Sequence, residues 1–104
     1  MIVTTSDNVP GREIQETFGL CRGSAIRARH MGKDILAGLK NIVGGEMHEY
    51  SKLLAETREQ ALDRMMEDAR AKGADAVVAV RYASTSIAQG AAEFLAYGTA
   101  VKLS

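Results

Sequence analysis

Residues 46–72 read EMHEYSKLLAETREQALDRMMEDARAK, a stretch rich in Glu, Leu, Met, Arg and Ala, which favour helices. Acidic residues open the stretch, and Arg70 and Lys72 close it, as the helix dipole prefers. Gly73 follows at the position where many helices end in the left-handed conformation. The stretch therefore predicts one long helix that ends at Lys72.

The apolar side chains of this helix cover more of its circumference than one sheet can bury. They spread over about 220°, whereas a helix lying on one sheet needs only about 100°. These residues are Met47, Tyr50, Leu53, Leu54, Ala61, Leu62, Met65, Met66 and Ala69. The helix would be about 40 Å long, and a compact chain of this size is about 33 Å across. We therefore expect several copies of the chain to share the burial, or else a short helix at residues 31–43 to cover the surplus.

The segments on both sides of the long helix have the patterns of strands. The predicted strands are residues 2–5, 13–28, 76–82 (with an extension to 87 left open) and 92–103. Apolar residues at spacings of three, four and seven predict the short helix at residues 31–43. The order β-β-α-α-β-β predicts a single α+β domain over residues 1–104, with a two-layer antiparallel sheet, one long helix and one short helix.

The second predicted strand has one face of small residues. Gly19, Cys21, Gly23 and Ala25 share one parity, while the other parity carries large apolar residues. Those large residues are Ile14, Phe18, Leu20 and Ile26. A face of small residues is typical of a strand that another backbone approaches closely, or of a strand with a glycine kink.

Composition excludes several classes of function. The 104 residues include 13 basic and 13 acidic ones, so the positive excess of nucleic-acid binders is absent. One cysteine cannot form an internal disulfide, which indicates a reducing compartment. We find neither a signal peptide nor an apolar run of about 20 residues. We expect a soluble cytoplasmic protein with no nucleic-acid or membrane partner.

Three side chains are candidate ligands for a soft or borderline metal ion: Cys21, His30 and His48. In a regular strand Cys21 and His30 point to opposite faces, unless a β-bulge between them changes the parity. The spacings C-x-x-C and H-E-x-x-H do not occur. A metal site would therefore need copies of His30 or Cys21 from several subunits. Otherwise Cys21 is a small buried side chain and His30 is hydrogen-bonded to the backbone at a strand end.

No pattern in the sequence predicts a catalytic residue. Ser24 and Ser51 lack the G-x-S-x-G context of an activated serine. Acidic pairs such as Glu59 and Asp63 lie on the polar side of the long helix, which is typical of a solvated surface.

Two features could bind an anion. Gly44 and Gly45 precede the helix N-terminus, but Glu46 would repel an anion there, and a tight turn is the simpler interpretation. Arg27 and Arg29 share a strand face and are candidates for an anion site or for pairing between subunits.

Three stretches closely resemble the YbjQ-like family, a bacterial family named for heavy-metal binding and without an assigned molecular function. They are GLCRGSAIRARHMGKDILAGLKNIVGGEMHEYSKLLAETREQAL, GADAVVAVRY and EFLAYGTAVKL, and the resemblance covers nearly the whole chain. It implies a subunit similar to the dodecin-like fold, which assembles into a ring, typically a pentamer and sometimes a stacked pair. The positions that recur in the family are Arg27, His30, Asp34, Asn41, Gly44, Gly45, Glu46, Tyr50, Gly98 and Thr99.

Together, the helix surface and the resemblance predict a homo-oligomeric binding or scaffold protein, expected to be a pentameric ring or a decamer. The alternative is a small enzyme with an active site between subunits. The predicted ligand site or polar network between subunits comprises Arg27, Arg29, His30, Asp34, Asn41, Gly44, Gly45, Glu46 and Tyr50. A divalent or soft metal ion is the candidate cofactor, with His30 and Cys21 as ligands only if several subunits share them.

Overall fold

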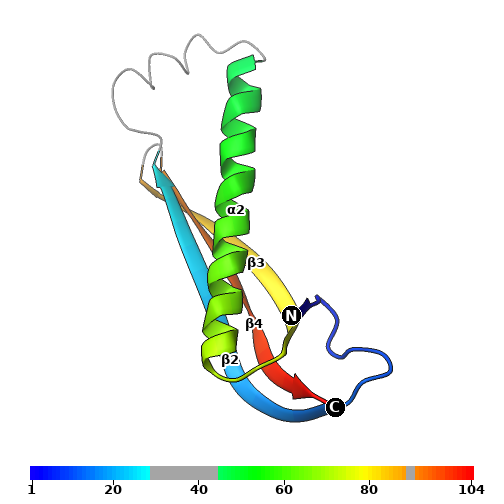
Figure 1. Cartoon of the computed structure of the whole chain (residues 1–104). Coiled ribbons are helices and arrows are strands. Elements are labelled where there is room, and N and C mark those ends of the chain that lie inside the picture. The colour runs from blue at the N-terminus through cyan, green and yellow to red at the C-terminus, as the bar shows by residue number, and fades with distance from the viewer. Residues whose placement is uncertain (29–44, 89–90) are drawn as a thin grey trace.

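The computed structural model describes residues 1–28, 45–88 and 91–104, with side chains for all of these except 28, 45–50 and 88. Figure 1 shows one long helix beside a twisted sheet. The elements are β1 (Ile2–Val3), β2 (Ile14–Ala28), α2 (Gly45–Ala71), β3 (Ala76–Ala88) and β4 (Ala91–Leu103). The short helix predicted at residues 31–43 lies outside the described residues. The other predicted elements are found within a few residues of their expected bounds.

Helix α2 ends with the glycine cap that the sequence predicts. Gly73 has a φ of 91°, in the left-handed region that favours glycine. Its N–H donates to the carbonyl oxygen of Arg70 at 2.9 Å, and the N–H of Ala74 donates to that of Ala69 at 3.1 Å. This pair of bonds is the Schellman motif, which satisfies carbonyl groups at the end of the helix.

The sheet has the strand order β1-β3-β4-β2. β4 pairs antiparallel with β2 and with β3, but β1 pairs parallel with β3. The sheet is therefore mixed, and the prediction of an antiparallel sheet is wrong for β1. A strand of two residues is too short for its sequence to indicate whether it pairs parallel or antiparallel. The path of residues 4–13, which follow β1, decides its direction.

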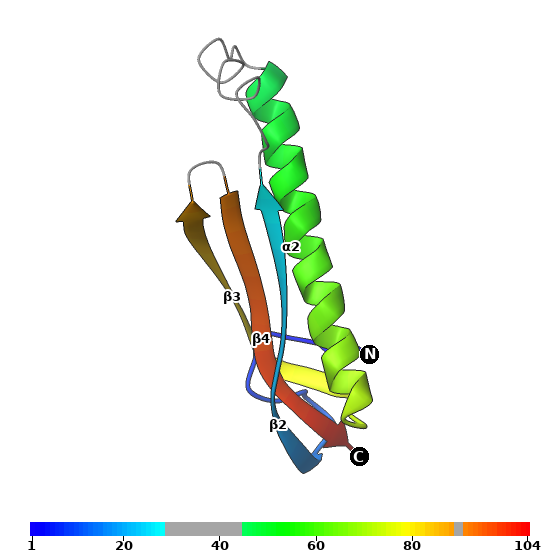
Figure 2. The same cartoon turned by 90° about the vertical axis from the view of Figure 1, so that its left-hand side faces the viewer.

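Helix α2 covers only part of the sheet. It packs on β2 and β4 and barely touches β3, as Figure 2 shows from the side. Four fully buried side chains recur every four residues along the helical stripe that faces the sheet: Thr57, Ala61, Met65 and Ala69. Three of the four are small, so the helix can lie close to the strands.

The small face of β2 lies against this stripe, as the sequence predicts. Cys21 is fully buried, Ala25 is nearly so, and a Cβ built on Gly23 would lie 2.5 Å from the carbonyl oxygen of Ala61. Such a distance shows that the backbones of β2 and α2 are in direct contact at Gly23. The prediction of a strand approached by another backbone is confirmed.

A β-bulge in β2 changes which of its large side chains are buried. The register with β4 shifts between Thr17 and Gly19, whose φ is 90°. Phe18 packs against the core under the helix, whereas Leu20 and Ile26 lie on the opposite face and are each 58% exposed. The bulge therefore separates side chains that the sequence pattern placed on one face.

Strand β3 contains a bulge of its own. The register with β4 shifts between Val78 and Arg81, and Ala79 has a φ of 54°. At this bulge the N–H of Ala79 donates to the carbonyl oxygen of Ser6 at 2.8 Å, and that of Val80 donates to the oxygen of Thr4 at 3.0 Å. The N-terminal segment thus covers the lower edge of β3 and stops at the bulge.

The chain is elongated. Its extents are 54 × 22 × 16 Å and its radius of gyration is 17.2 Å, whereas a compact chain of this length has about 13 Å. In both views α2 reaches past the ends of the strands. A single copy therefore leaves part of its sheet and helix uncovered.

Candidate functional site

The residues predicted to form a site gather at one end of the molecule, so far as the structure describes them. Arg27 is the last but one residue of β2, and this end of the strand lies towards the end of the molecule where α2 begins (Figure 1). The backbone of Gly45, Glu46 and Tyr50 lies in the first turns of α2. The other predicted members lie outside the described residues: Arg29, His30, Asp34, Asn41 and Gly44.

Arg27 is held against the helix by a buried hydroxyl group. Its Nε donates to Thr57 Oγ1 at 3.1 Å, and Thr57 Oγ1 donates to the carbonyl oxygen of Leu53 at 2.8 Å. Because Thr57 is fully buried, it fixes the position of the guanidinium group of Arg27. Among the side chains that the structure describes, which do not include those of Glu46 and Glu49, no carboxylate lies within ion-pair distance of that guanidinium.

A second arginine increases the positive charge at this end of the sheet. Arg58 follows Thr57 on α2, and its Cζ lies 5.8 Å from the centre of the Phe94 ring. Phe94 pairs with Ala25, two residues before Arg27 in the strand. The two guanidinium groups thus lie on the helix side of the same two strands, where they could attract an anion.

Cys21 lies in the core below this site. It is fully buried, and its Sγ donates to the carbonyl oxygen of Gly98 at 3.6 Å. Burial, reinforced by the negative charge of Asp68, raises the pKa of the Cys21 thiol. These observations agree with the interpretation of Cys21 as a small buried side chain and disfavour a nucleophile or a metal ligand at this position.

We expect the Cys21 thiol to react with iodoacetamide at pH 7 at least about tenfold more slowly than free cysteine. Burial blocks access, and the raised pKa keeps the thiol protonated. The rate would be measured by mass spectrometry of the labelled protein, with labelling in denaturant as the control. A rate equal to that of free cysteine in the folded protein would contradict this prediction.

The described residues do not fit a metal centre. The side chains that the structure describes, those of residues 1–27, 51–87 and 91–104, include no group of three or more His, Cys, Asp or Glu that could hold a metal ion. The one cysteine points into the core. A metal site in this chain would therefore depend on residues such as His30, which the structure does not describe.

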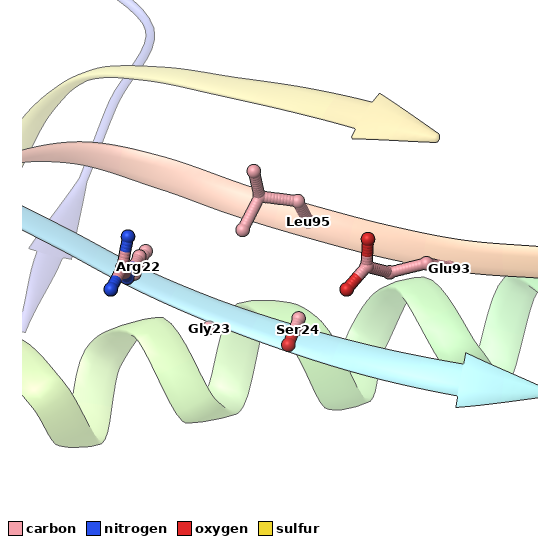
Figure 3. A pocket seen from close by; sticks show the side chains of 5 residues that line it. All are labelled: Arg22, Gly23, Ser24, Glu93 and Leu95. Atoms are coloured by element: carbon pink, nitrogen blue, oxygen red, sulfur yellow. The ribbon is translucent and has the colours of Figure 1, made fainter. Parts of the chain in front are cut away.

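A shallow pocket opens on the face of the sheet away from α2. It is lined by Arg22, Gly23, Ser24, Glu93 and Leu95, from β2 and β4 (Figure 3). The guanidinium of Arg22 and the carboxylate of Glu93 lie at its two ends, with Leu95 between them. Sequence analysis did not select this pocket, although the alternation of β2 places Arg22 and Ser24 on the face opposite Gly23.

Helix side chains cap the outer edge of β2. Asp68 Oδ2 accepts a hydrogen bond from the backbone N–H of Arg22 at 3.0 Å, and Arg64 Nη1 donates to the carbonyl oxygen of Ser24 at 2.7 Å. Lys72 Nζ donates to Asp68 Oδ1 at 2.8 Å. The hydrogen bonds from Lys72 and from the Arg22 backbone lower the pKa of Asp68.

We expect Asp68→Asn to lower the free energy of unfolding by about 1 kcal/mol at pH 7, because the charged hydrogen bonds are lost. The folded protein lowers the pKa of Asp68, so this contribution is present at neutral pH and disappears as the pH falls below about 4. Urea denaturation at several pH values measures it. The exposed Asp63→Asn is the control, and an equal effect of both substitutions would contradict the role of Asp68.

The fold and the site define a class of small α+β proteins in which one long helix covers half of a four-stranded sheet. The chain belongs to the YbjQ family, whose sequence model, described as "Putative heavy-metal-binding", matches residues 1–104. No helix in the described part of the chain has the length and apolar character needed to span a bilayer.

Three relatives, all UPF0145 proteins, align with 99% of this chain. That of Methanosarcina acetivorans is 57% identical over 103 residues, which are 97% of its length. Those of Archaeoglobus fulgidus and Vibrio parahaemolyticus are 55% and 50% identical, over 95% and 98% of their lengths. Because the family includes archaeal proteins, its description as bacterial is wrong.

A solved structure shares this fold over the whole length of this chain. It is a DUF74-family protein of unknown function from Pediococcus pentosaceus, with a TM-score of 0.66 and 13% sequence identity. The alignment covers 100% of this chain and 98% of the other. At this identity the similarity concerns the fold alone, and the relation to the dodecin-like fold stays a prediction.

Proposed function

We propose that this protein is a homo-oligomeric binding protein, a ring of five or ten copies, that holds a small anionic ligand at its subunit boundaries. Arg27 is the anchor of the ligand. The observation that carries this proposal is the half-buried guanidinium of Arg27, which Thr57 orients and which no described carboxylate neutralises. A guanidinium group that is partly withdrawn from water can bind an anionic partner through charge-assisted hydrogen bonds.

Exposed apolar surface supports the assembly. Leu20 and Ile26 are each 58% exposed on the open face of the sheet, and Leu62 and Met66 are only partly buried on the helix. These side chains lie on two different faces, so a neighbour on each side could cover them. A ring provides such neighbours for every copy.

Light scattering after gel filtration tests the assembly. We expect a mass of five or ten copies of the 11.2 kDa chain. The double substitution Leu20→Asp with Ile26→Asp should reduce this mass, because charged groups resist burial at an interface. A wild-type protein that is monomeric at micromolar concentration would refute the ring.

Calorimetry with inorganic phosphate tests the anchor. We expect Arg27→Gln to weaken phosphate binding at least about tenfold, since a charge-assisted bidentate contact is lost. Arg22→Gln is the matched control, because Arg22 lies on the opposite face of the same strand. Equal binding by wild type and Arg27→Gln would exclude Arg27 as the anchor.

The description of the family suggests a second candidate, a metal ion bound by copies of His30. The burial of Cys21 leaves His30 as the better of the two predicted ligands. Calorimetry with Zn²⁺, Cu⁺ and Ni²⁺ on wild type and His30→Ala would test it, and identical weak heats in both would reject it. A small enzyme with an active site between subunits also stays a prediction.

A further inference from the structure

Thr57 leaves Arg27 with one free edge for a ligand. A guanidinium group can hold an anion through Nε with one Nη nitrogen, or through its two Nη nitrogens. The Nε of Arg27 already donates to Thr57 Oγ1 at 3.1 Å. The edge that remains for a ligand is therefore the one formed by Nη1 and Nη2.

The hydroxyl group of Thr57 has no further proton to give. It donates its proton to the carbonyl oxygen of Leu53 at 2.8 Å, and Thr57 is fully buried. The hydroxyl group cannot turn away from Arg27 without leaving a buried polar group unpaired. Thr57 thus fixes the direction of the Nη edge of Arg27 before a ligand binds.

The surface around Arg27 is apolar where the structure describes it. Ala92 lies opposite Arg27 in β4 and is partly buried against the core, as is Leu54, one turn before Thr57 in α2. Phe94 is 8% exposed, and Arg58, which lies over its ring, is itself exposed to water. A single half-buried guanidinium beside apolar side chains matches a ligand with one negative charge and an apolar body.

We propose that the ligand of this site is an organic monocarboxylate and that Thr57 is the positioning residue that prepares Arg27 for it. This inference rests on the anion site at Arg27 proposed above and names the class of its ligand. The two oxygens of a carboxylate match the parallel N–H groups of Nη1 and Nη2, and one guanidinium neutralises its single charge. Phosphate carries more than one negative charge near pH 7, so part of its charge would stay unpaired beside the half-buried Arg27.

Calorimetry with isovalerate and with inorganic phosphate tests the class of ligand. We expect isovalerate to bind wild type at least about tenfold more tightly than phosphate and than isovaleramide, which has the same shape and no charge. Arg27→Gln should remove the difference between the acid and the amide. Arg22→Gln, on the opposite face of β2, is the matched control and should keep it.

The Nε–H signal of Arg27 in NMR spectra of ¹⁵N-labelled protein tests the role of Thr57. In wild type we expect isovalerate to change this signal little, because Nε keeps its bond to Thr57. Thr57→Val has nearly the same shape but frees Nε, so isovalerate should shift the signal and bind at least about fivefold more weakly. Thr57→Ser retains the hydroxyl group and should behave as wild type, and circular dichroism checks that both variants fold.

The outcomes separate this inference from the function on which it rests. If phosphate binding depends on Arg27 and isovalerate binds no more tightly, the class of ligand is overturned and the anion site stands. If neither isovalerate nor phosphate binds, the proposed function is overturned as well. If Thr57→Val keeps both the affinity and the Nε–H signal of wild type, the positioning role of Thr57 is overturned.

Discussion

Gly23→Ala should lower the free energy of unfolding by about 3 kcal/mol or more, because the added methyl group has no space. Its Cβ would lie 2.5 Å from the carbonyl oxygen of Ala61 and 2.6 Å from the backbone carbon of Arg64. These are backbone atoms of a helix, which cannot move aside as a flexible side chain can. The helix must shift away from β2 as a whole.

Guanidinium denaturation followed by circular dichroism measures the effect of Gly23→Ala. Ser24→Ala is the matched control, since Ser24 is the next residue in β2 and lies on the opposite face. We expect the control to stay within about 0.5 kcal/mol of wild type. If Gly23→Ala were as stable as the control, the close contact of β2 with α2 would be wrong.

Met65→Ala should cost about 3 kcal/mol of unfolding free energy, within the range for large side chains removed from a core. Met65 is fully buried between α2 and the sheet, and it is the largest of the fully buried side chains. The buried cluster that contains Met65 consists mainly of alanine and valine, whose small side chains cannot fill the space left behind.

The adjacent methionine provides the control for Met65→Ala. Met66 is only partly buried, so Met66→Ala should cost less than about 1 kcal/mol in a single copy. Both variants are compared by their denaturation midpoints at low protein concentration. Equal losses would show that α2 is rotated relative to the sheet. A larger loss for Met66→Ala at high concentration would indicate that a second copy covers it.

The long helix and the close contact at Gly23 could be predicted because short-range patterns specify them. Helix formers, end charges and Gly73 define α2, and the alternation of small residues identifies the face of β2 that meets it. These signals are local, so they need no knowledge of the rest of the chain.

The sequence allowed a glycine kink in β2, but it could not place the β-bulges of β2 and β3, which decide which side chains join the core. Thr17 and Gly19 shift the register of β2, so that Phe18 joins the core while Leu20 does not. Ala79 occupies a left-handed conformation that alanine rarely adopts, because the N-terminal segment hydrogen-bonds the backbone there. Both outcomes depend on partners far away in the sequence.

The candidate site stays a prediction, and sequence analysis missed most of the hydrogen bonds around it. Arg27 was selected, but Thr57, which holds it, has no motif of its own and looked like an ordinary helix residue. The capping of β2 by Arg64 and Asp68 was also missed, because a helix side chain that reaches a strand backbone leaves no sequence signature. Such contacts depend on how α2 lies across the sheet.

The side chains of Asp68 and Arg64 also limit how many copies of the sheet can add to one another through strand pairing. A molecule with both sheet edges available could add copies without end and form fibres, whereas a molecule with one available edge stops at a pair. Asp68 and Arg64, near the end of α2, therefore obstruct one of the two edges at which copies of this sheet could add to one another.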